Sequence, residues 1–333
     1  MTKQPDFVEA LLRPETYAHQ PQQVELVQTQ MSFIFLAGDL VYKVKKPVDL
    51  GYLDYTTLEK RRFFCQQELE LNRRLCPEAY LEVVPIVTRQ GQILLGGGGE
   101  VIEYAVKMKF LPADRMMDKL LPQNLVTEDM LARVAEKLAA FHGQAKTSTD
   151  IGTYGKPEAI KVNSDENFGQ TEKYIDISIP ANSYRKIKAY NDNFLKSNKS
   201  LFNKRIEEGR IKDCHGDLHA AHVCISNGIC IYDCIEFNDR FRYGDVASEI
   251  AFLAMDLDRF RHPELSRAFV DAYVRLSGDK DLLQLLNFYK CYRAYVRGKV
   301  TSFMLDDKYI PETEKPELLA TAKMYFELAG SYV

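Results

Sequence analysis

Side chains able to act as bases or metal ligands are concentrated in one segment of this sequence. Three of the six histidines lie between Cys214 and His222, in the run Cys-His-Gly-Asp-Leu-His-Ala-Ala-His. Two further carboxylates, Asp233 and Glu236, follow a short apolar run that is typical of a strand. Phosphoryl transfer from ATP requires a carboxylate that orients the acceptor hydroxyl, ligands for the metal on the phosphates, and a lysine on the phosphate oxygens. This segment offers candidates for the first two requirements.

At these residues the chain resembles the aminoglycoside phosphotransferase and choline kinase group, which has the protein-kinase-like fold. The catalytic loop of that group reads His-Gly-Asp, then four residues and Asn, followed by a strand with a metal-binding Asp and by an acid ahead of a small apolar helix. The matching positions are His-Gly-Asp at 215–217, His222 in place of the Asn, Asp233 at the end of the next strand, and a helix start at 244–251. The resemblance implies a kinase that uses ATP and Mg²⁺, with Mn²⁺ as the alternative metal.

The resemblance also implies a role for each matching residue. Asp217 would be the catalytic base or the carboxylate that orients the hydroxyl, and His215 would brace the loop. Asp233 would be the principal metal ligand. The departure is His222, because Mg²⁺ prefers oxygen ligands whereas imidazole suits softer metals. The sequence leaves open whether His222, a water held by it, or Glu236 completes the second metal position.

A kinase-like fold also implies a lysine on an early strand that contacts the nucleotide phosphates. The run Leu-Val-Tyr-Lys makes Lys43 the expected residue, with Lys45 as the reserve because strand alternation places it on the same face. A buried or phosphate-facing lysine needs a fixed counter-charge. Glu68, on the following predicted helix, is the expected partner, and Glu70 is the second candidate.

Two further nucleotide contacts follow from the same resemblance. The phosphate loop is expected at 28–32, where Ser32 and backbone amides would replace the glycine-rich loop of protein kinases. Adenine is expected to meet backbone groups of about Met108 to Phe110, in the segment that joins the lobes. The four glycines at 96–99 come after the lysine in the chain and are interpreted as a hairpin turn.

The elements that must position these residues change in character near Pro112. Before it, a short helix is predicted near Phe7 and one long helix over 56–75, among strands at 24–27, 33–36, 40–44, 81–88, 92–95 and 101–110. After it, helical spacing dominates at 116–121, 127–142, 171–209, 263–277 and 280–305, with a strand pair near 222–235 and a loop at 150–170.

The expected fold class is therefore α+β, a two-lobed protein-kinase-like fold. Residues 1–108 form the expected N-lobe, a small antiparallel sheet with one long helix that binds the nucleotide. Residues 109–333 form the expected C-lobe, which is mainly helical and carries the catalytic loop, the metal site and the acceptor-binding helices.

Composition narrows the class of protein. With 46% hydrophobic residues, 27% charged residues and a net charge of -3, the chain is neither disordered nor collagen-like nor a coiled coil. No apolar stretch approaches the roughly 20 residues that span a bilayer, and no basic segment followed by an apolar run begins the sequence. We therefore expect a cytoplasmic protein without membrane contact. The seven cysteines are odd in number and irregular in spacing, which favours reduced thiols.

Three functions stay open at this point. The first is an ATP-dependent kinase that moves the γ-phosphoryl group to a hydroxyl held against Asp217. The second is a nucleotide-binding regulator, or pseudokinase, without acceptor turnover, because His222 replaces Asn. The third is a zinc-dependent hydrolase that uses Cys214, His215, His219 and His222, although their spacing matches no closed Cys and His pattern.

The acceptor and the partners are indicated only weakly. Residues 185–212 carry nine Lys or Arg against three acids, which indicates either an anionic acceptor or a solvated helix face. Lys290, Arg293 and Arg297 share one helical face and fit either substrate binding or structural pairing. Nucleic acid is a possible acceptor, but the net charge of -3 does not favour it. The related proteins are sometimes fused to a P-loop ATPase, whose Gly-x-x-x-x-Gly-Lys-Ser/Thr motif is absent here, so such a domain is expected only as a fused or separate partner.

Overall fold

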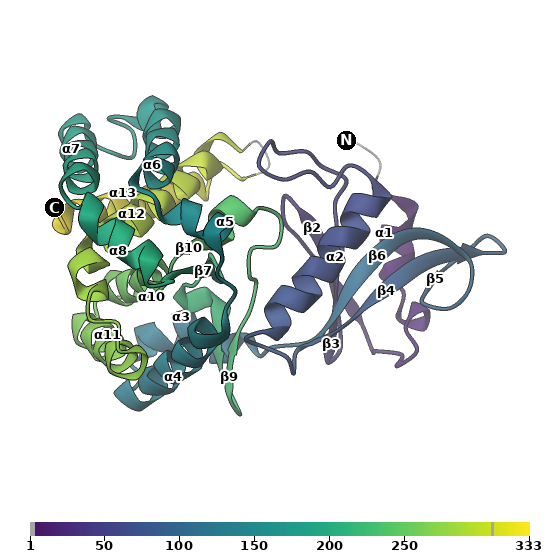
Figure 1. Ribbon diagram of the computed structural model, residues 1–333. Helices are drawn as coiled ribbons and strands as arrows, with labels where there is room; N and C mark the ends of the chain where they lie inside the picture. The colour runs from purple at the N-terminus through teal and green to yellow at the C-terminus, as the bar shows by residue number, and fades with distance from the viewer. Residues whose placement is uncertain (1–3, 308–309) are drawn as a thin grey trace. The chain divides into compact units, whose positions relative to one another are not determined.

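The computed structural model describes residues 4–307 and 310–333, which form two compact units. The first unit contains the chain up to Met116 together with His222–Asp239. The second contains Met117–Ala221 and Arg240–Val333. The first is built on a sheet and the second is mainly helical, so the predicted two-lobed α+β class is confirmed (Figure 1). The units differ from the predicted lobes in two respects: the first stretch ends at Met116 rather than at residue 108, and the chain returns to the first unit at His222–Asp239, whereas the prediction assumed two continuous lobes.

A six-stranded sheet forms the centre of the first unit. Its order is β1-β2-β3-β6-β4-β5, with antiparallel neighbours throughout. All six predicted strands are confirmed: β1 (Val24–Gln28), β2 (Ser32–Ala37), β3 (Leu40–Lys45), β4 (Tyr80–Arg89), β5 (Gln92–Leu95) and β6 (Glu100–Lys109).

The two faces of this sheet carry different helices. Helix α2 (Leu58–Arg73) packs on β4 and β6 (Figure 1). It begins after Thr57, whose side chain accepts a hydrogen bond from the Lys60 amide and so caps the helix. Helix α1 (Asp6–Leu11) belongs to a separate core with Tyr42 and Val44 of β3. Because side chains alternate along a strand, Lys43 and Lys45 point to the opposite face of β3, toward α2.

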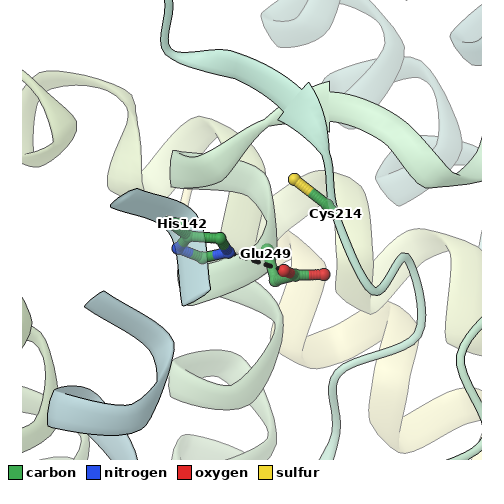
Figure 2. A group of neighbouring side chains, drawn as sticks. All are labelled: His142, Cys214 and Glu249. Carbon is green, nitrogen blue, oxygen red and sulfur yellow. Dashed lines mark hydrogen bonds and ion pairs between the residues drawn. The ribbon is translucent and has the colours of Figure 1, made fainter. Parts of the chain in front are cut away.

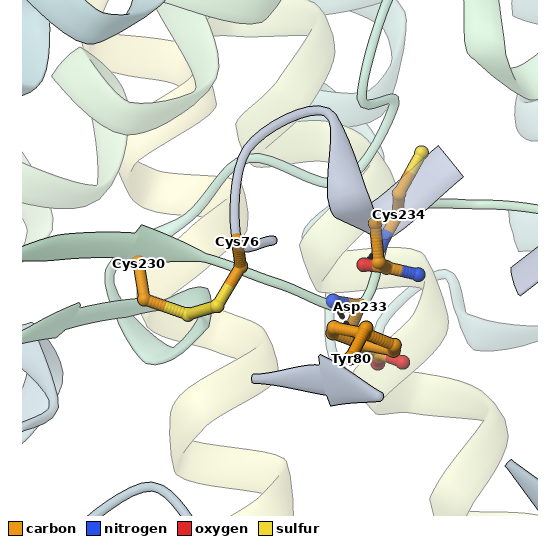
Figure 3. Close-up of a disulfide and its surroundings, with 6 residues drawn as sticks. Cys76, Tyr80, Cys230, Asp233 and Cys234 are labelled. Carbon is orange, nitrogen blue, oxygen red and sulfur yellow. Dashed lines mark hydrogen bonds between the residues drawn. A yellow bond between two sulfur atoms is a disulfide. The ribbon is translucent and has the colours of Figure 1, made fainter. Parts of the chain in front are cut away.

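A disulfide joins two distant parts of the first unit. Cys76, just after α2, is bonded to Cys230 on β9 (Ile229–Ile231), which pairs with β8 (Val223–Ile225) (Figure 3). The other five cysteines are buried thiols. The expectation that all seven cysteines are reduced is therefore wrong for this pair. Spacing could not reveal it, because the two residues are 154 positions apart and meet only when the hairpin returns to α2.

The second unit surrounds the buried helix α10 (Val246–Arg259), which packs on α11 (Pro263–Ser277) and α12 (Leu282–Phe303). Helix α13 (Lys315–Ser331), which the sequence pattern did not reveal, packs on α12. The remaining elements are α3 (Met117–Leu120), α4 (Glu128–Gln144), α5 (Thr149–Gly152), α6 (Pro157–Thr171), α7 (Ala181–Ser197), α8 (Lys199–Glu207), β7 (Ile211–Asp213), α9 (Asp239–Arg242) and β10 (Tyr243–Asp245).

The predicted loop at 150–170 is wrong, because this stretch contains α5 and α6. Pro157 begins α6 at a position where a proline is tolerated, rather than interrupting a helix. Ile160 and Phe168 supply the buried side of α6, while its Asn, Ser and Asp residues had favoured a loop. Within the described residues, no helix has both the length and the apolar character that crossing a bilayer demands.

Candidate active site

In the first unit, Lys43 of β3 lies between two carboxylates. Its Nζ is 2.8 Å from Glu68 Oε1 and donates a hydrogen bond to Asp233 Oδ1 at 2.9 Å. The Glu68 side chain is 1% exposed, that of Lys43 17% and that of Asp233 43%. Burial alone would lower the pKa of Lys43, but Asp233 and Glu68 raise it well above its usual value. A cationic amine and an accessible carboxylate therefore stand side by side.

Lys45 lies on the same face of β3 but is enclosed. Its Nζ donates to Glu68 Oε2 at 2.7 Å and also to Glu236 Oε1, and the Lys45 side chain is 1% exposed. Glu68 thus faces both lysines, whereas the reserve candidate Glu70 is exposed and accepts a hydrogen bond from Gln66. Burial alone would raise the pKa of the Glu68 carboxyl, but Lys43 and Lys45 lower it.

The backbone at Asp233 is held from α2. Asp233 has a φ of 63°, a left-handed conformation that costs energy outside glycine and needs surrounding support. The Cys234 amide donates to Asn72 Oδ1 at 2.9 Å, and the Asn72 side chain donates to the Glu68 carbonyl. Tyr80 lies beside Asp233, whose amide approaches the phenol oxygen at 3.4 Å (Figure 3). The conformation of Asp233 is thus linked to the helix that carries Glu68.

His222 also lies beside Asp233, with its Nε2 3.6 Å from Asp233 Oδ2. Its ring packs against Tyr232, at 5.5 Å between centroids. The chain therefore brings together Lys43, Glu68, Asp233 and His222, four of the residues singled out from the sequence. The exposed carboxylate of Asp233 fits a hard cation such as Mg²⁺, while the imidazole of His222 is a poorer ligand for it.

The remaining candidates of this unit lie at strand ends. Ser32 is buried at the start of β2, opposite Lys45, and its amide donates to Thr29 Oγ1. Met108 is on β6 opposite Val41. The Phe110 side chain is exposed, but its amide already donates to the Asp39 carbonyl at 2.9 Å. An adenine contact at 108–110 must therefore use backbone groups other than this amide.

In the second unit, Glu249 of α10 braces the loop that follows β7. Its Oε1 accepts hydrogen bonds from the amides of His215 and Gly216, both at 2.8 Å. Its Oε2 is 2.7 Å from His142 Nε2 (Figure 2), and His142 Nδ1 is 2.7 Å from the Tyr273 hydroxyl. Burial alone would raise the pKa of Glu249, but His142 and the loop contacts lower it to about 2. The carboxylate is therefore ionised and fully engaged.

The same loop is held from two further directions. Arg293 of α12 donates to the Gly216 carbonyl at 3.0 Å and to Ser248 Oγ at 3.1 Å. The Ala220 amide donates to Asp256 Oδ2 at 2.9 Å. Between these anchors, the Asp217 side chain is 33% exposed and its Oδ2 lies 3.6 Å from His219 Nε2. Asp217 is therefore an accessible carboxylate on a rigid loop.

Sequence reasoning missed His142, which carried no signal on its own, and gave Glu249 no role. Cys214 lies with these two residues in one buried group (Figure 2), and its Sγ donates to the Gly244 carbonyl at 3.5 Å. Both ring nitrogens of His142 are already hydrogen-bonded, so the group acts as a brace rather than a metal centre. The place of His142 in the last turn of a predicted amphipathic helix, after Leu138 and Phe141, indicates burial but identifies no partner.

Residues 64–286 match the sequence profile described as the phosphotransferase enzyme family. The chain belongs to this family. It is 32% identical over 311 residues to uncharacterized proteins of Mycobacterium tuberculosis and Mycobacterium bovis. That match covers 93% of this chain but only 60% of each relative.

Solved structures of low sequence identity share the fold of this family member. A choline/ethanolamine kinase family protein from Mesorhizobium loti aligns with a TM-score of 0.54 at 11% identity, covering 98% of both chains. An ethanolamine kinase from Plasmodium vivax aligns with a TM-score of 0.50 at 10% identity, covering 92% of this chain and 81% of that one. These likenesses confirm the kinase-like fold, and the family match confirms the resemblance to the phosphotransferase group.

Proposed function

We propose that this phosphotransferase family member transfers the γ-phosphoryl group of ATP to a hydroxyl of a small-molecule acceptor. The observation that carries the proposal is the contact of Lys43 with both Glu68 and Asp233. It sets a fixed cation beside an accessible carboxylate, which is the arrangement that nucleotide phosphates and their divalent cation require.

In the proposed reaction each residue has one task. Lys43 binds phosphate oxygens, and Asp233 holds the divalent cation, with His222 beside it. The bound cation supplies charge neutralisation on the phosphates. Asp217 orients the acceptor hydroxyl and accepts its proton as the new oxygen–phosphorus bond forms and the bond between the γ-phosphorus and the bridging oxygen breaks, so that ADP leaves. Glu249 and Arg293 keep the Asp217 loop in place.

The ion pairs of the second unit bear on the class of acceptor. Lys188 lies 3.4 Å from Asp192, Lys204 lies 2.6 Å from Asp281, and the buried Arg205 is paired with Asp245 and Asp279. Lys290, on α12, donates to Asp258 at 2.8 Å. Much of the basic segment at 185–212 is thus paired internally, which weakens the argument for an anionic acceptor. Amino alcohols, sugars and nucleosides all belong in a first acceptor screen.

Location and partners are part of the proposal. We place the reaction in the cytoplasm, where ATP is available. The chain spans about 60% of the mycobacterial relatives, and we propose a P-loop ATPase as a fused or separate partner.

The first test is calorimetric titration with ATP and with GTP, in Mg²⁺ and then in Mn²⁺. We expect metal-dependent binding to the unmodified protein and its loss in Asp233→Ala, with binding retained in the control Glu25→Ala on exposed β1. No nucleotide binding by the unmodified protein would overturn the proposal.

The second test measures turnover with the acceptor that the screen identifies. Asp217→Asn is expected to lower kcat by roughly 10²–10⁴-fold, since this is the range of general acid–base contributions, while nucleotide affinity is retained.

A second candidate function rests on His222, whose imidazole stands beside Asp233 where an oxygen ligand suits Mg²⁺ better. Metal-dependent nucleotide binding without turnover of any acceptor would favour that function, a nucleotide-binding regulator.

A further inference from the structure

The first unit contains a second lysine–glutamate pair that phosphate binding does not require. Lys45 and Glu236 form an ion pair in which the Lys45 side chain is 1% exposed and that of Glu236 7%. Tyr55, also buried, donates to the same Glu236 oxygen at 2.6 Å. This pair joins β3 to the segment that follows Asp233.

Exposure separates the tasks of the two strand lysines. The Lys43 side chain is 17% exposed and contacts the accessible Asp233, so its amine is open to a phosphate. The Lys45 amine is enclosed by Glu68, Glu236 and Tyr55. A buried ammonium is tolerated only when it is paired and hydrogen-bonded, and Lys45 meets this condition entirely within the protein.

Charge balance shows what Lys45 does for its neighbours. Glu68 and Glu236 are both buried carboxylates, and each has one oxygen on Lys45. Without Lys45, Lys43 would be the remaining lysine for Glu68, Glu236 and Asp233. It would then be drawn toward the carboxylates and away from a phosphate. Lys45 thus keeps Glu68 Oε1 directed at Lys43 and keeps Glu236 from competing.

The pair also fixes the chain on the far side of Asp233. The Cys234 amide is held by Asn72, and three residues after Asp233 the Glu236 side chain is held by Lys45 and Tyr55. The left-handed Asp233 lies at the start of this clamped stretch. An oxygen of Glu236 that receives two donors is poorly placed to serve as a metal ligand.

We propose that Lys45 is a positioning residue that, with Tyr55 and Glu236, holds the Asp233 segment and the Lys43–Glu68 pair in the geometry for nucleotide binding. This inference rests on the proposed function and extends it to residues that contact neither the nucleotide nor the metal. We call Lys45, Tyr55 and Glu236 together the clamp. The inference assigns Glu236 to this clamp rather than to the second metal position.

The deciding variant replaces the whole clamp by apolar residues, as Lys45→Met, Tyr55→Phe and Glu236→Leu together. Removing these three residues at once leaves no orphaned charge or hydroxyl among them, and Glu68, which loses Lys45 from Oε2, keeps Lys43 at Oε1. Replacing a buried ion pair by apolar residues in this way is often neutral for stability. A purely structural clamp therefore predicts unchanged nucleotide binding once the variant is folded. We expect instead that the folded variant binds ATP with Mg²⁺ at least tenfold more weakly.

Hydrogen exchange gives a readout that does not depend on nucleotide. Peptides covering 233–238 are expected to exchange at least tenfold faster in the triple variant, while peptides of α10 are unchanged. Tyr42→Phe, which removes a buried tyrosine hydroxyl on the other face of β3, is the matched control and should stay within twofold in both measurements. Binding within twofold of the unmodified protein, together with unchanged exchange, overturns the inference.

Two further outcomes remain decisive. If the unmodified protein binds no nucleotide, the proposed function fails, and the exchange rates alone then judge the clamp. If the triple variant does not fold, Tyr55→Phe takes its place, with an expected change of threefold or more in both measurements. No change in Tyr55→Phe would then overturn the role of the clamp.

Discussion

Asp217 owes its position to residues far from it in sequence. The Glu249 carboxylate accepts from the two amides before Asp217, and His142 fixes that carboxylate from α4. A carboxylate with this many donors is stabilised in its charged form. The loop conformation therefore depends on the ionisation of one buried glutamate.

This dependence predicts a defined acid sensitivity. The pKa of Glu249 falls from 4.5 to about 2 on folding, so the carboxylate contributes stability above about pH 4.5 that is lost as the pH falls toward 2. At 1.36 kcal/mol per pKa unit, the contribution is roughly 3 kcal/mol. Glu249→Gln should be less stable at pH 7 by an amount of this order and should lose less stability between pH 4.5 and pH 2.5.

Far-UV circular dichroism during urea unfolding measures this, since the chain contains no Trp to serve as a fluorescent probe. Glu264→Gln, an exposed acid at the start of α11, is the control. Equal acid sensitivity of Glu249→Gln and the unmodified protein would contradict the prediction.

At the residue scale, the site residues that could be identified from the sequence are those that belong to short motifs. The resemblance to the kinase-like group implied Lys43, at the end of its apolar run, and Asp233, after a strand, and the structure brings both together with Glu68. His142 could not be predicted, because it meets Glu249 only across 107 positions of chain. Glu236 could be assigned only once the contacts with Lys45 and Tyr55 were visible.

At the element scale, α2 is the helix that connects the sheet of the first unit to the returning segment 222–239. It carries Glu68, its Asn72 holds the Cys234 amide, and the disulfide after its last turn reaches β9. The strands and α2 could be predicted because alternation and charge spacing are strong there. The helices at 150–170 and α13 could not, because their polar residues and weak periodicity hid the buried positions.

The disulfide predicts a measurable loss of stability on reduction. It closes a sequence separation of 154 residues, and disulfides typically contribute about 2–4 kcal/mol. We expect Cys76→Ser with Cys230→Ser, or added reductant, to lower the unfolding free energy of the first unit by about this amount. Cys65→Ser, which removes a buried thiol of the same core, is the comparison variant.

Alkylation of the denatured, unreduced protein checks the bond directly. Five modified cysteines by intact mass are expected, matching the five buried thiols. Seven modified cysteines would show that the bond is absent from the purified protein.

At the scale of the whole molecule, the first unit is assembled from two separated pieces of chain. Residues 222–239 supply Asp233, Glu236 and the β8–β9 hairpin. The ends of the two pieces are close together, since Met116 forms a β-bridge with Cys224. Residues 117–221 of the second unit are therefore inserted between neighbouring points of the first.

This arrangement predicts which fragments fold. Residues 4–116 alone should be unfolded, because the buried Lys45 would lose Glu236 and Lys43 would lose Asp233. The same residues joined to 222–239 by a short Gly/Ser linker after Met116 should fold. Circular dichroism and resistance to proteolysis distinguish the two, and a folded 4–116 fragment would contradict the prediction.

The dependence of residues 4–116 on residues 222–239 also affects folding during synthesis on the ribosome. Lys45 leaves the ribosome 191 residues ahead of Glu236, and at about 5–20 residues per second this separation corresponds to roughly 10–40 s. During that interval Lys45 of β3 and Glu68 of α2 are already made, but Glu236, which encloses Lys45 in the folded protein, is not yet available. The first unit, although its six-stranded sheet is made early, is completed only after residues 222–239 have emerged, and a nascent chain stalled before residue 222 would present an unfinished first unit to chaperones.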